Sequence, residues 1–147
     1  MKRFVFIFAL LALIFSACGT GNTASPTPAP TEEPLPVIGI DVEHMINPGD
    51  AYEIPAGAGF ILDGSGYDFG IPDGPSEIQV VLDGHAFTVA WLPGALTQTV
   101  RAGSLLPPPG FNPLTGFPSG KQLIIAVGRI SDKGRFEPLW VAVVNVR

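Results

Sequence analysis

Cys18 is the residue whose chemistry is easiest to read, because it is the only cysteine in the 147-residue chain. In an exported protein a single thiol cannot form an internal disulfide, so it is open to covalent modification. Cys18 follows Lys2–Arg3, twelve uninterrupted apolar residues (Phe4–Phe15) and the small pair Ser16–Ala17. Spanning a bilayer takes about 20 residues. The shorter apolar run, with its basic start, instead favours a secretory signal peptide.

This order of basic, apolar and small residues before a cysteine resembles the signal peptide of bacterial lipoproteins, although Phe15 stands where that family usually has leucine. The resemblance implies cleavage before Cys18 and covalent lipid on it, a diacylglycerol with an N-acyl chain such as palmitate. Stable anchoring takes more than one chain, at about 0.8 kcal/mol per buried CH₂. We expect a signal peptide over residues 1–17 and a mature protein anchored outside the cytoplasm, at the cell surface or outer membrane. The alternatives are a plain signal peptide with a chance cysteine, or an uncleaved anchor.

The segment after Cys18 has the composition of a spacer. Residues 19–36 contain five prolines and four threonines and almost nothing apolar. Such a segment cannot bury enough surface to fold. Its alternating prolines favour an extended chain of roughly 50 Å. We predict a disordered linker over residues 18–36, with O-glycosylation of the threonines as the alternative to a plain spacer.

The charge balance argues against polyanionic partners. Two of the eight basic residues lie in the predicted signal peptide, so the mature chain has six against 13 acidic residues, a net charge of −7. Nucleic acids and anionic headgroups call for basic patches, so we expect neither as a partner.

The remainder, residues 37–147, is long enough for one domain with a hydrophobic core and has the pattern of an all-β protein. Glycine and proline interrupt the chain too often for long helices, and short β-branched runs recur between turn signals. We expect an Ig-like antiparallel β-sandwich of about seven or eight strands. The predicted strands are Val37–Glu43, Ala51–Ile54, Gly59–Asp63, Glu77–Leu82, His85–Trp91, Thr97–Arg101, Gln122–Arg129 and Pro138–Val146.

Three local features refine this prediction. Asp83–Gly84 favours a two-residue hairpin turn, and Ser131–Gly134 joins the last two strands in a similar way. Pro138 has no N–H to donate, so it should mark the start or the edge of the last strand.

Two stretches, Gly57–Tyr67 and Ile78–Gly84, resemble the IPT/TIG type of Ig-like domain, and Ser119–Val127 matches a later strand of that type. Residues 54–65 are similar to the start of a polycystin-type (PKD) repeat, without its aromatic-rich centre. Both families are sandwiches that serve as spacers or adhesive modules, and neither implies catalytic residues.

The sequence offers no catalytic set. No serine stands in a G-x-S-x-G elbow, and His44 and His85 have no second histidine or cysteine nearby for zinc. We therefore predict that the protein is not an enzyme and has no cofactor apart from the lipid. A weak alternative is calcium, which takes carboxylate and carbonyl oxygens. Its candidate ligands are Asp63, Asp68, Asp73 and Asp83, whose simpler role is to form turns.

The candidate binding surface comes from aromatic residues and one long loop. Loops beyond about 12–15 residues are uncommon and often functional, and Gly103–Gly120 is such a loop, with five prolines. We expect it to present Phe111 and Phe117, or to fold them over the open end of the sandwich. Trp91 and Tyr67 are the other candidates, as a stacking platform. The leading hypothesis is a non-enzymatic, lipid-anchored module for adhesion or scaffolding that binds an envelope protein. The alternative is a domain that binds carbohydrate or another ligand through exposed aromatics.

Overall fold

The computed structural model describes residues 33–41, 51–57 and 59–147, and these residues form strands joined by turns and loops. The short elements follow from the sequence, because glycine and proline recur before any run reaches helical length. The strands are β1 (Val37–Gly39), β2 (Tyr52–Ile54), β3 (Gly59–Asp63), β4 (Glu77–Leu82), β5 (His85–Ala90), β6 (Thr97–Arg101), β7 (Gln122–Ile130) and β8 (Phe136–Val146). One 3₁₀ turn, η3 (Ala102–Ser104), follows β6.

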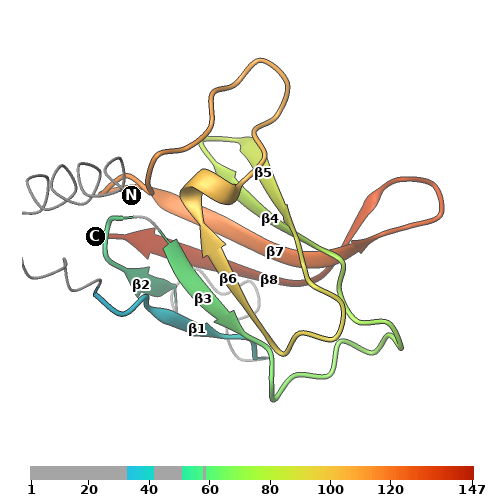
Figure 1. Ribbon diagram of the computed structural model, residues 1–147. Coiled ribbons are helices and arrows are strands. Elements are labelled where there is room, and N and C mark those ends of the chain that lie inside the picture. The colour runs from blue at the N-terminus through green and yellow to red at the C-terminus, as the bar shows by residue number, and fades with distance from the viewer. Residues whose placement is uncertain (1–32, 42–50, 58) are drawn as a thin grey trace, which may run out of the picture. The chain divides into compact units, whose positions relative to one another are not determined.

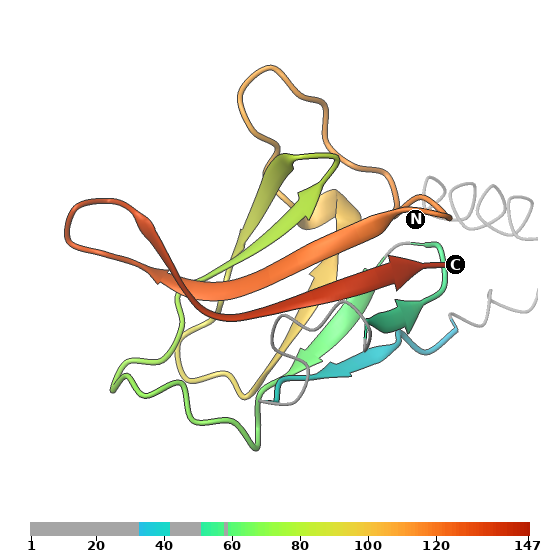
Figure 2. The same cartoon turned by 180° about the vertical axis from the view of Figure 1, so that it is seen from behind.

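The strands form two sheets, in the order β1-β3-β6 and β2-β8-β7-β4-β5. The small sheet lies against one face of the large sheet (Figures 1 and 2). The all-β sandwich predicted from the sequence is therefore confirmed. The ranges expected for β3, β4 and β6 agree with the structure, and those for β5, β7 and β8 differ by one or two residues at an end. β2 begins one residue later than expected. β1 ends at Gly39, so Ile40 and Asp41, which were predicted to continue it, are not part of the strand, and the last two predicted residues, 42–43, lie outside the described residues.

Side chains that alternate along the strands fill the space between the sheets. In β4 every second residue is buried, which is the pattern of a strand with one face on the core. Trp140 of β8 and Phe60 of β3 are the largest fully buried side chains. No polar or charged residue among those described is buried. The sandwich is thus held mainly by apolar burial, at about 25 cal/mol for each Å² removed from water.

The first two strands pair parallel to their neighbours, β1 with β3 and β2 with β8, whereas the other pairs are antiparallel as predicted. The Tyr52 hydroxyl donates to the Gly39 carbonyl and, at 3.3 Å, to the Asp41 carboxylate. The Trp140 indole donates to the Asp41 carbonyl at 2.8 Å. These contacts hold the end of β1 against the large sheet. Burial, and then the negative charge of Asp41, raise the pKa of Tyr52 to about 12.

Both predicted hairpin turns are present. In the turn between β7 and β8, the Gly134 N–H donates to the Ser131 carbonyl at 2.8 Å. Asp83 and Gly84 have φ angles of 50° and 81°, and they join β4 to β5 as a two-residue turn with positive φ at both positions, as Asp-Gly favours. Pro138 lies opposite Gly128 beside a register shift between β7 and β8. It lies at an irregularity, on a stretch of β8 that pairs only with β7 among the described residues, because β2 pairs with β8 only at Val144–Val146. The proline is therefore at an edge, as one of the two predicted positions, and not at the first residue of the strand.

The strand directions give the sandwich two distinct ends. The chain enters at Pro36, whose carbonyl accepts a hydrogen bond from Ile61 N–H at 2.8 Å, and we call this the entry end. The segments 55–57, 83–84 and 102–121 lie on the entry side of their strands. At the far end lie the loops 64–76 and 91–96 and the turn 131–135 (Figure 1).

Candidate functional site

The far end carries two adjoining hollows that we together call the far-end groove. The first has a volume of about 250 Å³ and is lined by residues 64, 67–69, 71–75, 91 and 94–96. The second, of about 420 Å³, is lined by residues 71–76, 91, 93, 129–130 and 132. Both include the segment Ile71–Pro75 and Trp91, so the two hollows adjoin along this segment, which we call the ridge. Both hollows are open to solvent.

A cluster of three aromatic rings supports the first hollow. The Tyr67 and Phe69 rings meet edge to face with centroids 4.9 Å apart, and Phe69 meets Trp91 in the same manner at 5.9 Å. Edge-to-face pairs contribute about 0.5–1.5 kcal/mol beyond the area they bury. Trp91 is only 3% exposed, and its indole N–H donates to the Ala95 carbonyl at 3.1 Å. These contacts fix the 91–96 loop and give the groove a rigid apolar wall.

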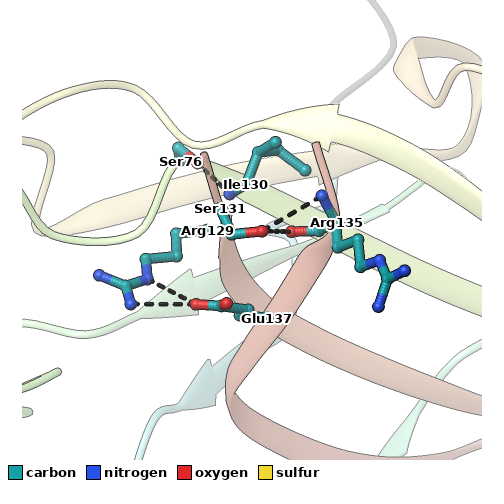
Figure 3. Close-up of polar contacts among 6 residues, drawn as sticks. All are labelled: Ser76, Arg129, Ile130, Ser131, Arg135 and Glu137. Carbon is teal, nitrogen blue, oxygen red and sulfur yellow. Dashed lines mark hydrogen bonds and ion pairs between the residues drawn. The ribbon is translucent and has the colours of Figure 1, made fainter. Parts of the chain in front are cut away.

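Ser76 ties the ridge to two strands, and Figure 3 shows its bond with Ile130. Its N–H donates to the Gly128 carbonyl and its carbonyl accepts from Trp91 N–H, both at 2.9 Å. Its hydroxyl oxygen accepts from the Ile130 N–H at 3.2 Å. This one residue, just before β4, therefore connects the end of the ridge to β7 and to the residue that follows β5. These bonds hold together the segments that line the second hollow.

The turn between β7 and β8 is ordered by its own hydrogen bonds (Figure 3). The Ser131 hydroxyl donates to the Arg135 carbonyl at 3.0 Å, and the Arg135 N–H donates to the Ser131 hydroxyl oxygen at 3.3 Å. Beside them, Arg129 is bound to Glu137 through two nitrogens, each at 3.0 Å. The basic group that lines the second hollow is thus already paired.

The remaining charge in the groove is negative. Asp68 and Asp73 line the first hollow, whose lining contains no lysine, arginine or histidine. Asp73 and Asp132 line the second. Two exposed apolar side chains line the same hollows, Leu96 in the first, at 64%, and Ile130 in the second, at 45%. The groove therefore combines apolar surface with carboxylates.

The four predicted binding residues do not form one surface. Trp91 and Tyr67 lie together at the far end, where both line the first hollow. Trp91 is buried and Tyr67 is half-buried, so the proposal of an exposed stacking platform with Trp91 is corrected: the indole belongs to the core, because it lies against Phe69 and beneath the 91–96 loop. Phe111 and Phe117 lie on the long loop of the entry side.

The long loop separates its two phenylalanines. Phe117 is 2% exposed, its ring lies 5.5 Å from that of Phe60, and its backbone pairs with Gly57 in both directions. The expectation that Phe117 is presented to solvent is therefore wrong, and the alternative, in which it covers the end of the sandwich, is the observed one. Phe111 is 44% exposed and its ring lies 4.0 Å from that of His85. Leu106 pairs with Thr88 and covers part of the free edge of β5.

The four calcium candidates do not converge either. Asp83 lies at the entry end, where both carboxylate oxygens accept from Lys121 Nζ at 3.0 Å. The other three lie at the far end, where Asp63 accepts from Ser65 N–H at 3.0 Å and Asp68 from Gly70 N–H at 2.8 Å. The Ser65 bond lowers the pKa of Asp63. Within residues 33–41, 51–57 and 59–147, no three potential ligands are grouped for a metal ion.

Sequence reasoning missed the ridge Ile71–Pro75 and the exposed leucines of the 91–96 loop. Both loops are rich in glycine and proline and follow strands that end at the same side. Those two signals were present, but only the strand directions bring the loops together.

None of the helices in the described part of the chain is long and apolar enough to cross a membrane. Comparisons with protein-family models, curated protein sequences and solved structures found no match.

Proposed function

We propose that the protein is a lipid-anchored, extracytoplasmic binding module without catalytic activity, and that the far-end groove is its binding surface in adhesion or scaffolding. The anchor is the lipid on Cys18, which the N-terminal residue order supports. The resemblance of residues 57–67 and 78–84 to IPT/TIG-type domains favours the same kind of role.

The observation that carries the proposal is the position of the groove. The chain enters the sandwich at Pro36, and the two hollows lie at the opposite end. A proline-rich linker of roughly 50 Å would hold the domain clear of the lipid headgroups. The groove, at the end of the sandwich opposite to Pro36, would then be open to a partner in the envelope or beyond it. The burial of Trp91 leaves the carbohydrate alternative without its expected platform.

Site-specific cross-linking in intact cells tests this function. A photo-reactive amino acid is placed at Leu96 in the groove, at Leu106 on the long loop, or at Ile124 on the outer face of β7. All three side chains are exposed, at 64%, 67% and 41%. We expect discrete adducts from Leu96 and none from the two controls. Adducts from Leu106 alone would move the function to the long loop, and adducts from none of the three would refute a binding role for the groove.

A further inference from the structure

We infer that the far-end groove binds an extended peptide segment of a partner protein, in which an apolar side chain stands next to a lysine or arginine. This inference rests on the proposed function and specifies its ligand. It follows from the shape of the groove, from its charge, and from the burial and packing of its aromatic rings.

The shape favours a peptide over a small molecule. Ligand pockets for small molecules usually measure about 300–1,000 Å³ and enclose most of the ligand. Here the volumes, about 250 and 420 Å³, are not unusual, but both hollows are open to solvent and would not enclose a ligand, and they adjoin along the ridge Ile71–Pro75. A ligand that fills both must cross the ridge. An extended chain does so readily, because its side chains project at regular intervals along its length.

The charge defines what the segment carries. The carboxylates of Asp68 and Asp73 have no cation beside them in the first hollow, and Arg129 of the second is bound to Glu137. An acidic segment would therefore meet repulsion, whereas a lysine or arginine would find two carboxylates beside the apolar wall. Complementary charge of this kind selects partners and sets their orientation. The exposed Leu96 of the first hollow and Ile130 of the second supply the apolar contact.

The aromatic rings argue against a glycan. A sugar stacks on the open face of a ring, but Trp91 is buried, and Phe69 meets both other rings edge to face. The cluster is a wall that supports the groove rather than an open platform.

A displayed library of random nonapeptides, selected on the full-length lipoprotein in detergent micelles, tests the inference. We expect the enriched peptides to carry lysine or arginine beside leucine, isoleucine or an aromatic residue, and to lose binding as the salt concentration rises. Asp68→Asn together with Asp73→Asn should weaken binding of the selected peptides about twofold to thirtyfold, since exposed charge pairs contribute about 0.2–1 kcal/mol each. Leu96→Ser should weaken it further.

Asp83→Asn is the matched control, because it removes a carboxylate at the entry end and asparagine tolerates the positive φ of that position. It should leave binding unchanged. Enrichment of acidic peptides, or no enrichment over the Leu96→Ser variant, would overturn the inference. So would glycan binding on an array that Tyr67→Ala abolishes, or self-association of the protein that Leu96→Ser abolishes. The cross-linking at Leu96 distinguishes the two failures. If one of these outcomes is found while Leu96 still cross-links to a partner in cells, only the ligand class is refuted. If Leu96 gives no adducts, the proposed function itself fails.

Discussion

At the scale of single residues, the two phenylalanines of the long loop have different roles although they lie six positions apart. Phe117 is buried against Phe60, whereas Phe111 lies beside His85 at the surface. Proline on both sides gives them similar sequence contexts. The difference arises from the backbone pairing of Phe117 with Gly57, a residue distant in the sequence.

We expect Phe117→Ser to lower the free energy of unfolding by about 3–5 kcal/mol, because it leaves a cavity and buries a hydroxyl. Phe111→Ser should change it by less than about 1 kcal/mol, as most surface substitutions do. Urea denaturation of the two variants measures both values. Equal losses would show that the exposed ring also contributes to the core.

Tyr52 gives the protein a pH dependence in the alkaline range. Its pKa is raised from 10.0 to about 12, so the folded state holds the proton more tightly than the unfolded state. The resulting stability is fully present below pH 10 and is lost as the pH rises toward 12. We expect a loss of about 1 kcal/mol, after allowance for solvent at the partly buried hydroxyl.

The measurement is the unfolding free energy of the wild type minus that of Tyr52→Phe, at intervals from pH 9 to 12. The subtraction removes the titration of the lysines, which the two proteins share. A difference that stays constant over this range would contradict the raised pKa.

At the scale of elements, the hairpin of β7 and β8 depends on a close contact at Gly128. A Cβ at this position would lie 2.3 Å from the Glu137 carbonyl oxygen and 2.7 Å from the Phe136 ring. The ring therefore occupies the space that the glycine leaves open, beside the register shift at Pro138. This contact shapes the segment that supplies Arg129 and Ile130 to the groove.

Gly128→Ala should lower the free energy of unfolding by about 1–3 kcal/mol. The obstructing oxygen belongs to the backbone, so both the strand and the Phe136 ring must move to make room. Gly39→Ala in β1 is the matched control: nothing lies within 4 Å of its Cβ position, so we expect a change within about 0.5 kcal/mol. Thermal unfolding of both variants provides the comparison. A neutral Gly128→Ala would mean that the hairpin adjusts without strain.

The elements also show what the sequence could predict. Strands such as β4 and β5 are found from alternation, and the turn between them from Asp83–Gly84, because these signals are local. The parallel pairing of β1 with β3, and of β2 with β8, has no local signal in the sequence. It depends on which edge of another strand is free. The groove is likewise non-local: Ser76, Trp91 and Ile130 meet only because three strands end at one side. The sequence identified Trp91 as a candidate binding residue, but it could not predict that the indole is buried.

At the scale of the whole molecule, the exposed apolar side chains of the groove and the proposed lipid on Cys18 are two separate causes that could produce membrane association. The groove exposes Leu96 and Ile130, and its carboxylates disfavour anionic headgroups. The lipid on Cys18, which lies outside the described residues, would contribute about 0.8 kcal/mol for each buried CH₂. The attachment should therefore depend on Cys18 rather than on the groove.

Cys18→Ala should move the protein from the membrane fraction to the soluble extracytoplasmic fraction, because the variant has no thiol to acylate. Leu96→Ser is the control: it reduces the apolar surface of the groove and should leave the protein with the membranes. Fractionation and immunoblotting of both variants, with mass spectrometry of the N-terminal peptide, separate the two causes. Retention of Cys18→Ala in washed membranes would refute lipid anchoring, and release of Leu96→Ser would assign the attachment to the groove, since acyl chains alone should hold the wild type in place.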